Sequence, residues 1–207
     1  MGDAKGVMGF LQRWSSTLFI VGGVVALIFA VRVPVQALTG TGYGNVGFLF
    51  LSGYILAFIG LLGLYPELSR QQRWMAGAGA IGACLGIVGF AGSVVVIGLD
   101  LVGMIPENPP VWLNTVPLSI IGMVGGFLTF GVASLRSDTS VRVLGFLLLI
   151  PGLLFGGSVI VDVAPGFDQW RFLFGAGQSI SFLAIGYVLR TRISWSARSS
   201  GRDWSAS

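Results

Sequence analysis

Three charged residues stand at the ends of long apolar runs, and they are the first candidates for chemistry. Arg32, Asp100 and Asp162 each follow such a run, and a proline comes a few residues after each. If the three side chains converge, a buried Arg32 needs one of the aspartates as its partner, because an unpaired buried charge is costly. Two neighbouring carboxylates would also permit acid–base catalysis. The simpler interpretation is that all three mark where the chain leaves an apolar environment for water, since charges are ordinary there.

Uncharged polar residues inside apolar runs form the second group of candidates. Gln178, Tyr187 and Thr129 carry side chains that could line the path of a small solute. The alternative is that each one hydrogen-bonds to a neighbouring helix, as polar residues in membrane helices commonly do. The sequence leaves both interpretations open, although the second needs no bound solute.

The residue types that are missing exclude more chemistry than those present suggest. The 207 residues include no histidine and one cysteine, Cys84. Histidine is the commonest metal ligand and a frequent general base, and a single cysteine cannot form an intramolecular disulfide or a multi-cysteine metal site. We therefore predict no metal site, no catalytic residue and no resident cofactor, while a bound lipid, quinone or pigment stays open. An enzyme that uses the outer carboxylates is the last of three functional alternatives.

The composition indicates that lipid surrounds the chain. Hydrophobic residues make up 54% of the sequence and charged residues 10%, whereas a soluble domain carries about 25% charged residues to face water. The 33 glycines agree, because glycine is commoner in transmembrane helices than in soluble ones. The net charge of +4 is not gathered into a basic stripe, so we expect no nucleic-acid partner.

Six segments are apolar and long enough to cross a bilayer, which takes about 20 residues. The predicted spans are Trp14–Val33, Phe48–Leu64, Trp74–Val102, Val116–Leu135, Val143–Val161 and Phe172–Leu189. The sequence thus predicts an all-α integral membrane protein, a bundle of six transmembrane helices. Residues 1–13 form an N-terminal segment, residues 14–189 the transmembrane domain and residues 190–207 a basic tail.

The basic residues predict the orientation of the bundle. Two of them, Arg32 and Arg171, lie on one side, and the others lie on the side of both termini: Lys5, Arg13, Arg70, Arg73, Arg136, Arg142, Arg190, Arg192, Arg198 and Arg202. Cytoplasmic loops carry the excess of Lys and Arg. We therefore expect a protein of the cell membrane with its N- and C-termini in the cytoplasm. Trp14, Trp74, Trp112 and Trp170 lie near span ends, where tryptophan prefers the membrane interface.

A weak repeat relates three pairs of spans. The separation of Arg32 from Asp100 resembles that of Asp100 from Asp162. In the even-numbered spans a glycine precedes a phenylalanine by the same offset, at Gly53 and Phe58, Gly122 and Phe127, and Gly177 and Phe182. Such similarity at a fixed period is typical of repeated structural units. Three tandem helical hairpins would explain it, and chance similarity among glycine-rich apolar segments is the alternative.

Small residues line one face of the third span: Gly79, Gly82, Gly86, Gly89 and Ser93. Intervals of three and four residues place them on one side of a helix, where small residues let a neighbouring backbone approach closely in lipid. We expect this span to be the most buried helix, packed against a helix of this chain or of another. In the fifth span, Pro151 predicts a kink.

The leading functional prediction is a non-catalytic accessory or scaffold subunit. It would pack against other membrane subunits, lipid or copies of itself, because the chain has many small-residue faces and no ionisable residue near mid-span. The second prediction is a channel or carrier for a small neutral or apolar solute, with Gln178 on its path.

Overall fold

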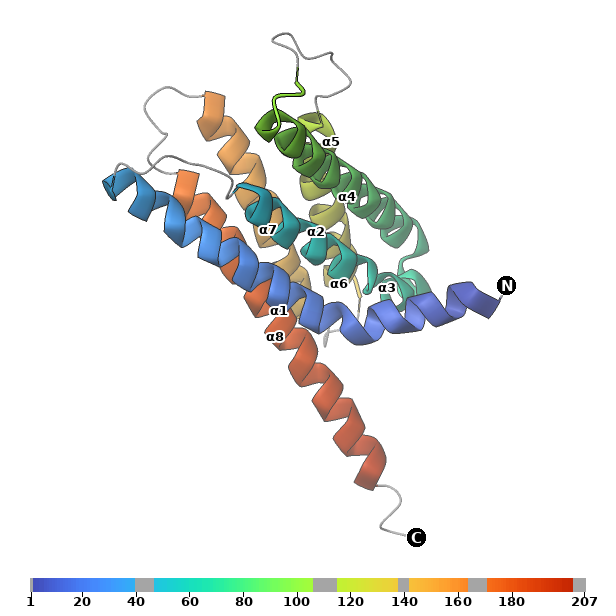
Figure 1. Cartoon of the computed structure of the whole chain (residues 1–207). Coiled ribbons are helices and arrows are strands. Elements are labelled where there is room, and N and C mark those ends of the chain that lie inside the picture. The colour runs from blue at the N-terminus through green and yellow to red at the C-terminus, as the bar shows by residue number, and fades with distance from the viewer. Residues whose placement is uncertain (1, 40–46, 106–114, 138–141, 164–170, 203–207) are drawn as a thin grey trace.

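The computed structural model describes residues 2–39, 47–105, 115–137, 142–163 and 171–202, and every regular element in these ranges is helical (Figure 1). The elements are α1 (Gly2–Thr39), α2 (Gly47–Leu62), α3 (Tyr65–Gln71), α4 (Arg73–Leu101), α5 (Val116–Ile121), the π-helix η2 (Gly122–Gly126), α6 (Phe127–Leu135), α7 (Arg142–Val163) and α8 (Arg171–Arg202). The expected all-α fold is confirmed.

All six predicted spans coincide with helices of this structure. Five stretches are long and apolar enough to cross a membrane, and α2 and α3 add a sixth if they count as one span bent by 42°. The fourth span runs from Val116 to Leu135 as predicted, through α5, η2 and α6 without a break. The chain is therefore a multi-pass helical bundle of the membrane type.

The helices form a ring in chain order. α1 packs against α2, α2 against α4, and α4 against the α5–η2–α6 span; α7 and α8 follow, and α8 closes the ring against α1. The start of α1, α3 and the last turns of α8 lie toward one end of the bundle, called here the termini end (Figure 1). The last turns of α1, α4 and α7 lie toward the opposite end, called the distal end.

Backbone chemistry explains two of the helix boundaries. Gly103 ends α4 with a φ of 68°, while the Gly103 and Met104 amides donate to the carbonyls of Asp100 and Leu99, both at 2.9 Å. This is the Schellman arrangement, which favours glycine because its backbone is left-handed there. Between α2 and α3, Pro66 stands in the first turn of α3, where its missing amide hydrogen costs nothing.

Helices continue past the predicted limits of the transmembrane domain at both ends of the chain. α1 begins at Gly2 and α8 continues to Arg202, so the helix is unbroken at the predicted domain limits near residues 13 and 190. The short helix α3 had no predicted counterpart. Pro151 lies inside α7, which is continuous from Arg142 to Val163.

The expectation that the third span is the most buried helix is wrong. Within the best apolar window of each span, 28% of the α4 window is buried, against 50% for the span Val116–Leu135. The glycines occupy only one face of α4. Its opposite face exposes large apolar side chains, among them Ile81, Val88 and Val95, so the described part of the chain leaves most of this helix surface uncovered.

Candidate functional site

Aromatic rings fill the centre of the bundle, and each of the six spans contributes at least one. The rings are Phe19, Tyr54, Phe58, Phe90, Phe127, Phe155 and Phe182. Tyr54 and Phe90 are stacked with ring centroids 4.9 Å apart, and Phe58 meets Phe127 edge-on at 5.5 Å. These separations lie within the range of favourable aromatic pairs, so the rings pack against one another across the interior.

Three of these phenylalanines are the ones related by the sequence repeat. Phe58, Phe127 and Phe182 are fully buried. The Phe127 ring lies between the other two, with its centroid 5.5 Å from that of Phe58 and 5.6 Å from that of Phe182. The three positions that the repeat relates thus lie next to one another at the centre of the bundle.

Gln178, the most polar residue predicted inside a span, bonds to a second polar side chain in this centre. Tyr54 on α2 donates a hydrogen bond to its Oε1 atom. Tyr54 is 1% exposed and Gln178 is 2% exposed, so bulk water cannot replace the hydrogen bond if either side chain is made apolar. Gln178 therefore links α8 to α2.

The other two polar candidates do not join Gln178. The Thr129 hydroxyl donates within its own helix, to the carbonyls of Gly125 at 2.6 Å and Gly126 at 3.1 Å. Tyr187 is 67% exposed on the outside of α8. The three residues predicted to line a pathway or to make interhelical contacts thus lie in different settings. Gln178 is in the centre, Thr129 bonds to carbonyls of its own span and Tyr187 faces outward.

The three charged candidates all belong to helices that end at the distal end. Arg32 lies near the end of α1, Asp100 in the last turn of α4 and Asp162 in the last turn of α7. Asp100 is exposed. The side chains of Arg32 and Asp162 lie outside the described part of the structure, as do Trp112 and Trp170.

The small-residue face of α4 packs inside this chain. A Cβ atom added at Gly82 would lie 2.7 Å from the backbone nitrogen of Gly126, which only two backbones in direct contact produce. The remaining members meet neighbours from α2, from the Val116–Leu135 span and from Thr115, which directly precedes that span. Gly79 faces Phe130, Gly86 faces Phe58, Gly89 faces Ser119, and the Ser93 hydroxyl lies 2.7 Å from that of Thr115. These residues hold α4 against two other spans of the same chain.

The same kind of contact recurs around the ring. Gly22 of α1 and Gly53 of α2 approach each other reciprocally, since an added Cβ at either would lie 2.6–2.7 Å from the carbonyl oxygen of the other. Gly131 and Gly145 pair α6 with α7 in the same way, at 3.2 and 3.0 Å. Close backbone contacts therefore position the central rings.

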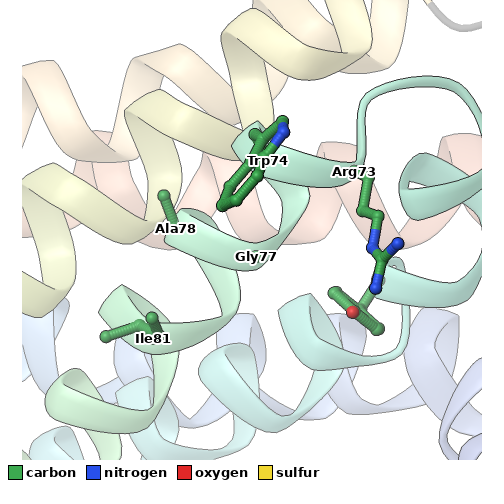
Figure 2. Close-up of a pocket in the computed structure, with 6 residues that line it drawn as sticks. Arg73, Trp74, Gly77, Ala78 and Ile81 are labelled. Carbon is green, nitrogen blue, oxygen red and sulfur yellow. The ribbon is translucent and has the colours of Figure 1, made fainter.

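A groove at the start of α4 had no sequence-based prediction. Arg73 and Trp74 form it with Tyr65, Gly77, Ala78 and Ile81 (Figure 2). The sequence does contain a signal for this groove. Trp74, Gly77, Ala78 and Ile81 are separated by intervals of three and four residues, which places them on one helix face.

In the described ranges, no group of three or more His, Cys, Asp or Glu side chains is placed to hold a metal ion. The central hydrogen bond joins two uncharged groups and provides no nucleophile–base pair of the kind covalent catalysis uses. No protein-family model matches the chain, and neither a curated protein nor a solved structure matches it.

Proposed function

We propose that this chain is a non-catalytic accessory or scaffold subunit of the cell membrane, which packs its outer helix faces against other membrane proteins and lipid. The observation that carries the proposal is the packed aromatic centre. Every span contributes rings to it, and its buried amide, Gln178, is bonded to Tyr54. An interior of this kind supports rigidity more than passage or turnover.

The outer face of α4 is the surface we assign to a partner subunit. Ile81, Val88 and Val95 recur every seven residues and are 66%, 57% and 58% exposed. Cys84 lies between them and is also exposed. Residues spaced by seven form one ridge along a helix, the arrangement through which helices pack against each other.

Cys84 provides the test, because it is the only cysteine in the chain. A membrane-soluble crosslinker with one thiol-reactive and one photoreactive end would be attached at Cys84 in native membranes. We expect one adduct of reproducible mass, containing a specific membrane protein that also copurifies after gentle extraction. The Cys84→Ala variant is the matched control and should give no adduct.

Two outcomes would overturn the scaffold proposal. One is a lone chain after gentle extraction, with adducts to lipid alone. The other is solute flux through vesicles that contain the purified protein. We expect these vesicles to pass glycerol no faster than empty vesicles, and faster passage would contradict the proposal. Faster flux that Gln178→Leu abolishes without unfolding the bundle would instead support a carrier.

A further inference from the structure

The groove at the termini end of α4 combines a cation, two aromatic rings and an apolar floor. Its volume is about 510 Å³, and its lining consists of Tyr65, Arg73, Trp74, Gly77, Ala78 and Ile81. Figure 2 shows Arg73 and Trp74 in the first turn of α4, with Ala78 and Ile81 further along the same helix. Volumes of about 300–1,000 Å³ are typical of small-molecule sites, so the groove can hold part of a ligand.

The mouth of the groove is positively charged. Arg73 lines it and is exposed, and Arg70 precedes it by three residues in the last turn of α3. Arg136 reaches the same turn of α4, where its Nη1 atom lies 3.7 Å from the sulfur of Met75, a residue outside the groove lining. Among the side chains described around the groove, Glu67 is the acidic one, and it is exposed to solvent. This charge balance favours an anion.

The floor of the groove is apolar and runs along the span away from the charges. Gly77 has no atom within 4 Å of where its Cβ would stand, Ala78 is exposed, and Ile81 is 66% exposed. Trp74 is 91% exposed at the mouth. A tryptophan so exposed at the end of a span fits the membrane interface, where its ring sits among headgroups. The order from mouth to floor is thus charge, aromatic ring, then hydrocarbon.

We propose that this groove binds one anionic diacyl phospholipid. Its phosphate lies at Arg73 and one acyl chain lies over Gly77, Ala78 and Ile81. Basic pockets on the cytoplasmic side of membrane helices recognise acidic headgroups in this way, and the predicted orientation places the termini end there. The proposal goes beyond the scaffold role, because it assigns the start of α4 to a lipid. Ile81 belongs to both surfaces, so the acyl chain would lie at the edge of a subunit that covers the rest of α4.

Lipid binding is measured on the delipidated full-length protein by native mass spectrometry. The two probes are phosphatidylglycerol and phosphatidylcholine with identical acyl chains. We expect the first to bind more tightly, and Arg73→Gln to weaken its binding roughly fivefold, the effect of one basic residue near an anionic headgroup. Binding of phosphatidylcholine should not change. Arg190→Gln, which removes an exposed cation from α8, is the matched control and should leave both lipids unaffected.

A second pair of variants tests the acyl-chain floor. Gly77→Leu should fill the groove and abolish specific phosphatidylglycerol binding, while Gly98→Leu makes the same change elsewhere on α4 and should have no effect. Both glycines have open space at the Cβ position, so both variants should fold, and a thermal melt checks this. Equal binding of the two lipids, or unchanged phosphatidylglycerol binding in Arg73→Gln and Gly77→Leu, would overturn the proposal.

Discussion

The hydroxyl of Tyr54 on α2 donates to the Oε1 atom of Gln178 on α8, and the two side chains form a polar pair in an apolar core rich in aromatic rings. The two residues are 124 positions apart in sequence. The ring of Phe90 stacks on Tyr54, and the ring of Phe182 meets it edge-on at 5.5 Å. A buried polar pair fixes the relative position of two helices more specifically than apolar contacts do, because its geometry is directional.

Removing either member of this pair should destabilise the bundle, and removing both should cost less than the sum. Tyr54→Phe keeps the ring but deletes the donor, and Gln178→Leu deletes the acceptor. We expect each to lower the unfolding free energy by about 1 kcal/mol, with a coupling of about 0.6–1.7 kcal/mol between them. Reversible unfolding in mixed micelles, with dodecyl sulfate as denaturant, measures all four proteins of the cycle. Strictly additive losses would show that the bond does not couple α2 to α8.

The glycine contact between α4 and η2 predicts a position-specific effect of bulk. Gly82→Leu would place a side chain against the Gly126 backbone, so the two spans must separate. Overpacking of this kind costs about 1–3 kcal/mol, which should lower the melting temperature by roughly 5 °C. Gly98→Leu on the same helix is the control, since nothing lies within 4 Å there. A similar melting temperature for both variants would mean that α4 does not pack through its glycine face.

Two buried serines should respond to alanine in opposite ways. The Ser134 hydroxyl is buried and has no hydrogen-bond partner in the described structure, so Ser134→Ala should be neutral or stabilising by up to about 1 kcal/mol. The Ser15 hydroxyl donates across helices to the Gly60 carbonyl at 2.8 Å. Ser15→Ala should therefore destabilise the protein by about 1 kcal/mol. Thermal melts of the two variants give the comparison, and a loss on Ser134→Ala as large as that on Ser15→Ala would contradict it.

The predicted orientation can be tested with two exposed acidic residues at opposite ends of the bundle. Glu67 lies on α3 at the termini end, and Asp100 lies in the last turn of α4 at the distal end. In a Cys84→Ala background, Asp100→Cys should react with a membrane-impermeant maleimide on intact cells. Glu67→Cys should react only after the cells are opened. The reverse pattern would place the termini outside the cell.

Hydropathy determined the positions of the spans. The chain has long apolar runs bounded by charges and loop residues, and a helix is the structure that satisfies every backbone group of such a run in lipid. The span Val116–Leu135 therefore agrees with the structure at both ends. The helix α3 could not be anticipated, because seven residues with a proline in the first turn carry too little periodic signal.

Only the tertiary structure decided which faces are inside. Tyr187 follows Gln178 by nine residues, which is two and a half turns, so the two side chains point to opposite sides of α8. The sequence determines that opposition, but in a chain apolar on every side it does not say which of the two sides meets another helix. The packing of α8 against the other helices places Gln178 in the centre, where Tyr54 of α2 donates a hydrogen bond to it. Tyr187 therefore faces outward.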